Sequence, residues 1–178
     1  MPASGEVLDI GCGTRKQEPG AFGIDRSPQS AADVVWDLDC YPWPLADNRF
    51  SRIYMSHIIE HFQDVTLAMA EVHRVAKDGA DVFIVTPHFS SHNSYTDPTH
   101  RRHLAVRSFE YFRAEDFPTF RGFPVAFDVA EVRLTFGGNL ILDNLGRLIS
   151  GRSIEWYERH AAWILPAQDI HCRLRVRK

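Results

Sequence analysis

The chain has 178 residues, of which 44% are hydrophobic and 24% charged, and this length is enough for one domain with a buried core. A net charge of −3 gives no general attraction to nucleic acid or to an anionic membrane. No apolar stretch approaches the ~18 residues that a membrane span needs. The cysteines Cys12, Cys40 and Cys172 lie far apart, which indicates reduced thiols. Because a strand-like run begins within a few residues of Met1, we expect a soluble cytoplasmic protein without a signal peptide, folded as a single domain over residues 1–178.

Short β-rich runs alternate with loops or helices in the first half of the chain, and most runs are continuously apolar. They are Glu6–Ile10, Ala21–Asp25, Asp33–Asp37, Arg52–Ser56 and Asp81–Thr86. Apolar residues recur at helical spacing in Asp64–Lys77, with Asp64 as N-cap and Asp78-Gly79 as the stop. This alternation predicts an α/β fold with a doubly wound, mostly parallel sheet, as in the Rossmann fold.

The first expected strand runs into a glycine turn, Gly11-Cys12-Gly13. Glycines at such a turn let the backbone bend tightly and approach a ligand closely. The second strand ends in Asp25, where a carboxylate can accept both hydroxyls of a ribose. The spacing argues against NAD, because Lys16 replaces the third glycine of the dinucleotide fingerprint and Asp25 follows the turn too closely.

The segment His57-Ile58-Ile59-Glu60-His61 follows the fourth strand and matches the H-x-x-E-H pattern of inverted zinc proteases. In that pattern two histidines share a helix face and the glutamate acts as a base. A catalytic zinc needs a third protein ligand, and none stands out downstream. We therefore favour two other roles for this segment: packing at the start of a helix beside a ligand, or contact with a substrate.

A histidine-rich loop follows the fifth strand, from His88 to His103, and Ser108 is expected to cap a helix after it. Ligands in open α/β sheets sit beyond the carboxyl ends of the strands, so this loop emerges beside the site. We predict His100 as a general base, with His88 as second choice and Asp97 orienting the imidazole. Two alternatives are a solvated loop held by Asx turns and a metal site made from His88, His92, Asp97, His100 or His103.

The C-terminal third differs in pattern. Val129–Phe136 and Asp169–Arg177 alternate strictly between apolar and polar residues, which predicts half-buried antiparallel strands. Asn139–Ile149 and Ile154–Ile164 are expected to be helical, so residues 137–165 form a helical insertion between the last two strands.

Several segments resemble the class I methyltransferases that use S-adenosylmethionine (SAM), particularly the small type 11 group. Leu8–Gly13 is similar to the first motif of that family, and Asp25 to its ribose-binding acid. The remaining similar segments, in the order in which the family has them, are Asp33–Leu38, Pro44–Ser51 and Glu71–Gly79. The resemblance covers Glu6 to Phe112 and implies an antiparallel last strand inserted beside strand five.

The resemblance has gaps. The third glycine of the family motif is Arg15 here, and only Thr14–Ala21 precede the second strand, too few residues for the usual helix. N-terminal helices are therefore expected to be short or missing. One sheet face should be poorly covered unless the C-terminal helices or another subunit cover it, so a homo-oligomer through that face is one expected assembly.

The resemblance implies transfer of the SAM methyl group to an oxygen or nitrogen of an acceptor. We expect this acceptor to be a small molecule, because the mild net charge argues against nucleic acid and a membrane, and we assign no metal ligands. The resemblance also implies cofactor contacts by Asp9, Gly11, Cys12, Gly13, Asp25, Arg26, Asp37, Leu38, Ser56 and His57. Asp37 would face the adenine amine. Two alternatives stay open: a module that binds SAM without turnover, and an H-x-x-E-H zinc hydrolase. The acceptor itself is not readable from the sequence.

Overall fold

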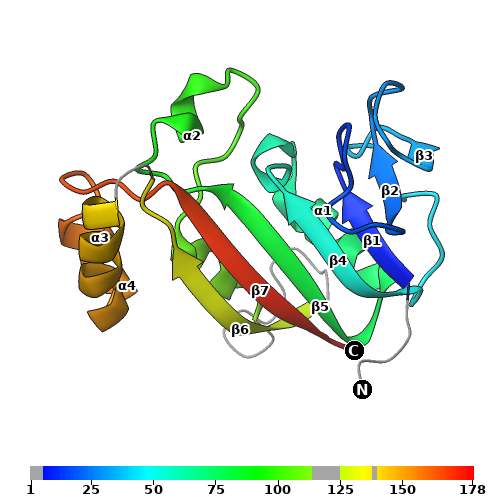
Figure 1. Ribbon diagram of the computed structural model, residues 1–178. Coiled ribbons are helices and arrows are strands. Elements are labelled where there is room, and N and C mark those ends of the chain that lie inside the picture. Colours follow the sequence, from blue (N-terminus) through cyan, green and yellow to red (C-terminus); the bar gives the residue numbers. More distant parts are fainter. Residues whose placement is uncertain (1–5, 114–124, 138–139) are drawn as a thin grey trace.

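A computed structural model describes residues 6–113, 125–137 and 140–178, and within these residues seven strands form one sheet. Their order across the sheet is β3-β2-β1-β4-β5-β7-β6, as Figure 1 shows. The strands are β1 (Glu6–Ile10), β2 (Phe22–Asp25), β3 (Val34–Val35), β4 (Phe50–Ser56), β5 (Ala76–Pro87), β6 (Ala126–Leu134) and β7 (Asp169–Arg177). The first five pair in parallel, so their carboxyl ends meet at one edge of the sheet.

The C-terminal strands pair as the alternating patterns predict. Strand β7 runs antiparallel to β5, with Cys172 opposite Ile84, and antiparallel to the edge strand β6, with Cys172 opposite Val132. The prediction of an antiparallel C-terminal strand inserted beside strand five is therefore confirmed. The edge strand itself is Ala126–Leu134, three residues earlier than expected at its start.

The helical elements are few and short among the described residues. They are η1 (Ile59–His61), α1 (Val65–Val75), α2 (Asn93–Thr96), η2 (Val106–Phe112), α3 (Leu140–Arg152) and α4 (Ile154–His160). Asp64 caps α1 as predicted, because its side chain accepts hydrogen bonds from the N–H groups of Thr66 and Leu67 at 2.9 and 3.2 Å. None of these helices has the length and apolar character of a membrane span.

Several expected elements differ in extent or type from the structure. The helix expected over Asp64–Lys77 ends at Val75, and Asp78-Gly79, expected as its stop, lies inside strand β5. The helix expected over Ile154–Ile164 ends at His160.

The expected third strand, Asp33–Asp37, is reduced to Val34–Val35. The Asp33 side chain accepts a hydrogen bond from the Gly23 N–H (2.7 Å) and binds Lys16. The helix expected to begin at Ser108 is the 3-10 helix η2, which begins at Val106. Ser108 lies inside it and its hydroxyl accepts from the N–H of Ala105 at 3.1 Å.

The two faces of the sheet are unequal. Ile53, Ile84 and Leu174 point to one face and are fully buried or nearly so. On the opposite face the rings of Tyr54 and Phe83 stack 5.3 Å apart while remaining half-buried. No helix lies in front of β4, β5 and β7 in Figure 1, among the residues that the structure describes. Ion pairs such as the one between Arg173 and Asp81 (3.7 Å) make this open face polar.

Candidate functional site

The glycine turn after β1 adopts the backbone that its residues predict. Gly11 and Gly13 have φ angles of +68° and +55°, in the left-handed region that favours glycine. A Cβ on Gly11 would lie 2.7 Å from the side chain of Ile58, whereas a Cβ on Gly13 would meet nothing within 4 Å. Gly11 therefore permits a close approach of the segment after β4, and the turn at Gly13 stays open to a ligand.

Two carboxylates hold this turn in place. Asp25, at the end of β2, accepts hydrogen bonds from the N–H groups of Gly13 and Ser27, both at 2.8 Å. Each carboxylate oxygen keeps a further lone pair, so Asp25 can still accept hydroxyl groups. Asp9 accepts from the N–H of Gln17 at 2.6 Å, and burial raises the pKa of Asp9.

A pocket of about 230 Å³ lies at the carboxyl ends of β1, β2 and β4. This is where open α/β sheets bind ligands, since loops from neighbouring strands diverge there. Its lining consists of Gly11, Asp25, Arg26, Asp37, Leu38, Asp39, His57, Ile58, His61 and Phe62.

Six of the ten residues predicted to contact a cofactor line this pocket: Gly11, Asp25, Arg26, Asp37, Leu38 and His57. The other four, Asp9, Cys12, Gly13 and Ser56, are not part of the lining. Cys12 is buried, and burial raises the pKa of its thiol to about 11, so it is a packing group next to Gly23. Asp9 and Gly13 act on the shape of the turn through the hydrogen bonds described above.

Sequence reasoning missed three pocket residues, Asp39, Ile58 and Phe62. Asp39 accepts a hydrogen bond from the N–H of Gln63 at 3.0 Å, which ties the loop after β3 to the segment after η1. Ile58 lies within the His57–His61 segment that we expected to pack beside a ligand, whereas no motif or spacing marks Asp39 and Phe62. Their place follows from tertiary contacts between segments that are distant in the sequence.

The segment His57–His61 does not form the helix face that the zinc-protease pattern requires. His57 has a φ of +52°, a left-handed conformation that is uncommon outside glycine, and η1 comprises three residues only. His57 lines the pocket, half of its side chain is exposed, and the neighbouring Glu60 carboxylate raises the pKa of His57. We therefore regard this segment as part of the pocket wall.

Glu60 is almost completely buried behind the pocket wall, with 2% of its surface exposed. Its Oε2 accepts a hydrogen bond from the hydroxyl of Thr86 at 3.0 Å. Its main-chain carbonyl accepts from the N–H groups of Arg101 and Arg102, at 2.8 and 3.1 Å. These contacts attach the histidine-rich loop to η1 and so bring His100 beside the pocket.

His100 lies against His61, with ring centroids 4.7 Å apart in an edge-to-face arrangement. Its Nδ1 donates to the carbonyl of Ser94 at 3.2 Å, so Ser94 is the group that orients the ring. Asp97 lies 3.9 Å from the other nitrogen, Nε2, and its hydrogen bonds are to Thr99, whose donors lower the pKa of Asp97. The acid–imidazole arrangement of a triad is therefore not formed by Asp97 and His100.

His88 is fully buried and does not line the pocket. Its ring nitrogens contact the hydroxyl of Ser90 at 2.7 Å and the carboxylate of Glu158 at 3.2 Å. Glu158 also accepts from the N–H of Val106 at 2.6 Å. His88 thus joins the end of β5 to α4, and the structure gives it the surroundings of a core residue.

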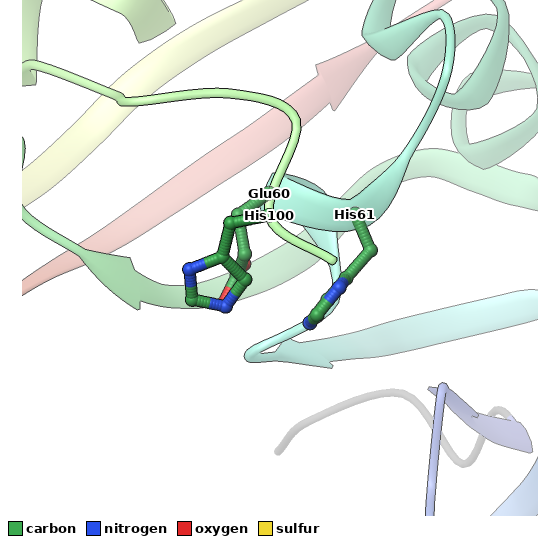
Figure 2. Close-up of side chains that lie close together, drawn as sticks. All are labelled: Glu60, His61 and His100. Atoms are coloured by element: carbon green, nitrogen blue, oxygen red, sulfur yellow. The ribbon is translucent and has the colours of Figure 1, made fainter. Parts of the chain in front are cut away.

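Among the described residues, one group of His, Cys, Asp or Glu side chains is close enough to hold a metal ion: Glu60, His61 and His100 (Figure 2). Of the five loop residues considered for a metal, only His100 belongs to this group. It combines the H-x-x-E-H segment with the histidine-rich loop.

Comparison with known proteins agrees with this geometry. Residues 1–123 match the family described as "Methyltransferase domain". No curated protein matches the sequence of the chain.

Solved structures share the fold at low sequence identity. The YcgJ protein from Bacillus subtilis is 18% identical, with a TM-score of 0.65, and the similarity covers 99% of this chain and 93% of that one. A SAM-dependent methyltransferase from Archaeoglobus fulgidus is 20% identical, with a TM-score of 0.59 and coverage of 98% and 87%. Phosphoethanolamine N-methyltransferase 2 from Haemonchus contortus, in complex with SAM, is 14% identical, with a TM-score of 0.59 and coverage of 99% and 49%.

Proposed function

The chain belongs to the class I SAM-dependent methyltransferases, and on that premise we propose that it transfers the SAM methyl group to an oxygen or nitrogen of a small-molecule acceptor. The observation that carries this proposal is the pocket at the carboxyl ends of β1, β2 and β4, with Asp25 and Asp37 in its lining. Bound SAM supplies an electrophilic methyl group on a sulfonium. The residues of the chain bind the cofactor and orient the two reactants.

The residues present fit this cofactor. Asp25 is nearly buried yet lines the pocket, and its free lone pairs suit the two ribose hydroxyls. Asp37 is exposed in the same lining, where its carboxylate suits the adenine amine. The methionine end is assigned to the Gly11–Gly13 turn, of which Gly11 lines the pocket. Holding the methyl donor and acceptor about 3–3.5 Å apart would account for much of the rate.

The acceptor side lies beneath the loop that carries His100. With Nδ1 bonded to the Ser94 carbonyl, the neutral ring has its free lone pair on Nε2, where it can take a proton from an acceptor hydroxyl. A histidine suits this role because its pKa lies near neutral pH. Arg101 and Arg102 are exposed beside it and would suit an acidic acceptor.

The cofactor assignment is tested by calorimetry with SAM on Asp25 variants. Asp25→Ala leaves the ribose hydroxyls without acceptors and should weaken binding by about 1–3 kcal/mol. Asp25→Asn preserves the shape of the side chain and should give a smaller loss. Asp128→Ala removes an exposed carboxylate on the edge strand and serves as the control with unchanged affinity.

Unchanged SAM affinity in Asp25→Ala would contradict the assignment of this pocket as the SAM-binding site. Normal SAM binding combined with no S-adenosylhomocysteine formed across a broad panel of hydroxyl and amine acceptors would instead favour a binding module without turnover. The two outcomes can be distinguished, because calorimetry measures SAM binding alone and the acceptor panel measures turnover.

A further inference from the structure

Beside the cofactor pocket, Glu60 and His61 of η1 meet His100 of the following loop (Figure 2). One ligand atom of each side chain lies within 4.8 Å of those of the other two. We propose that these three side chains form a binding site for a divalent transition-metal ion.

The first observation is an unpartnered buried oxygen. Glu60 is 2% exposed, and its Oε1 has no hydrogen-bond partner, whereas Oε2 is held by Thr86. Nδ1 of His57 and Nε2 of His100 lie 3.5 and 3.8 Å from this oxygen, distances longer than ordinary N–H···O bonds. A buried carboxylate oxygen without a partner is costly, and a bound cation would supply the missing interaction.

The second observation concerns the proton on His61. Its Nδ1 lies 3.0 Å from the hydroxyl of Thr99, and that hydroxyl donates its single hydrogen to Asp97 at 2.7 Å. The Thr99 oxygen must therefore accept a hydrogen from Nδ1 of His61. In the neutral ring this leaves the lone pair on Nε2.

His100 shows the same arrangement with a different partner. The carbonyl of Ser94 can only accept, so Nδ1 of His100 carries the hydrogen. Its lone pair is on Nε2, the atom that lies 3.8 Å from the free oxygen of Glu60. The His100 side chain is 8% exposed, so bulk water has little access to its ring nitrogens.

In each of the three side chains, one polar atom is thus hydrogen-bonded to a neighbouring residue, and a second atom keeps a lone pair that can bind a metal. A histidine that binds a metal through one ring nitrogen characteristically donates a hydrogen bond from the other. Two imidazoles and one carboxylate suit zinc, manganese, iron(II) or cobalt rather than magnesium or calcium, which prefer oxygen ligands. Bonds of about 2.0–2.2 Å would bring neighbouring ligand atoms to roughly 3–3.5 Å, so small side-chain rotations would close the site.

The site adjoins the proposed reaction. His61 lines the cofactor pocket as well as the cluster, and three protein ligands leave coordination positions open. An ion there would bind an acceptor hydroxyl and lower its pKa. With its Nε2 lone pair on the ion, His100 would not act as the base, so the hydroxyl proton would leave to water. The oxygen lone pair would then attack the methyl carbon as the carbon–sulfur bond of SAM breaks. This role rests on the proposed function, whereas binding of the ion does not.

The test uses the full chain, stripped of metal with a chelator and titrated with Zn²⁺, Mn²⁺ and Co²⁺ by calorimetry. We expect one ion bound per chain, a visible absorption band on adding Co²⁺, and a higher Tm with the ion present. Glu60→Gln preserves shape and should weaken ion binding at least ~10-fold, as should His100→Asn. Thr99→Val removes the hydrogen-bond acceptor of His61 Nδ1 and should weaken ion binding by a smaller factor.

The matched control is His92→Asn, an exposed histidine of the same loop outside the cluster, which should bind the ion as the unmodified chain does. SAM affinity, measured alongside, should be retained in Glu60→Gln, which separates loss of the ion from failure of the cofactor assignment. Absence of one-to-one binding, or equal affinity in the unmodified chain, Glu60→Gln and His100→Asn, would overturn the metal site. His57 would then be the charge partner of Glu60.

Discussion

The two sides of the proposed active site are held by different kinds of contact. On the cofactor side, neighbouring parallel strands hold each other: the N–H of Gly11 bonds to Ile24 and that of Gly13 to Asp25. On the acceptor side, Glu60 is joined by backbone bonds to a loop about forty residues further along the chain. Strand pairing positions the glycine turn and Asp25 on the first side, whereas the second side depends on loop packing.

This difference predicts different failures. Damage to the cofactor side should act on SAM affinity and on the fold together, because the same backbone serves both. Damage to the acceptor side should act on turnover while SAM binding persists. Four substitutions test this contrast.

The largest effect is expected for Gly11→Ala. The added Cβ would lie 2.7 Å from Ile58 and would force a side chain into a left-handed backbone. Together these terms should lower the free energy of unfolding by about 2–4 kcal/mol and weaken SAM binding. Urea denaturation and calorimetry measure the two effects.

Gly13→Ala is the matched control for this substitution. The alanine at position 13 has the same unfavourable left-handed backbone, but its Cβ contacts no other atom. The free energy of unfolding should therefore fall by only about 1–2 kcal/mol. Equal losses for both variants would show that the contact with Ile58 is not what requires glycine at position 11.

On the acceptor side, His100→Ala should reduce turnover roughly 10²-fold or more, the usual scale for a lost general base, while SAM affinity is retained. The ring serves the reaction as a base or as a metal ligand and does not line the cofactor pocket. If SAM affinity fell together with turnover, His100 would belong to the cofactor side and the contrast would fail.

The smallest effect on SAM binding and turnover is expected for His88→Ala, which removes a histidine of the same loop. Its buried ring holds Glu158 and Ser90, so its loss should lower the free energy of unfolding by about 1–3 kcal/mol. SAM affinity and turnover of the folded protein should stay within about twofold of the unmodified chain. A loss of turnover like that of His100→Ala, without loss of stability, would return His88 to the candidate bases.

The same contrast explains what could be predicted from the sequence. Strand β1 and the end of β2 at Asp25 were predictable because apolar runs and glycine turns are local signals. The order of parallel strands then gathers their ends without further information. The strict alternation in Asp169–Arg177 likewise predicted an antiparallel strand.

The acceptor side could be predicted only in pieces. Both the H-x-x-E-H segment and the loop around His100 stand out in the sequence, but nothing in their spacing says that they meet. Their contact depends on N–H groups of the loop that bond to the Glu60 carbonyl. The orienting role expected of Asp97 falls to the Ser94 carbonyl, a main-chain atom that no residue pattern reveals.

The backbone at His57 has a consequence for engineering this protein. A histidine at φ +52° bears a penalty of about 1–2 kcal/mol that glycine would not. Selection for thermostability alone would therefore favour glycine there and remove an imidazole from the pocket wall. Because we propose that His57 contacts the cofactor, heat resistance and cofactor binding would favour different residues at position 57, and stabilising libraries should hold it fixed.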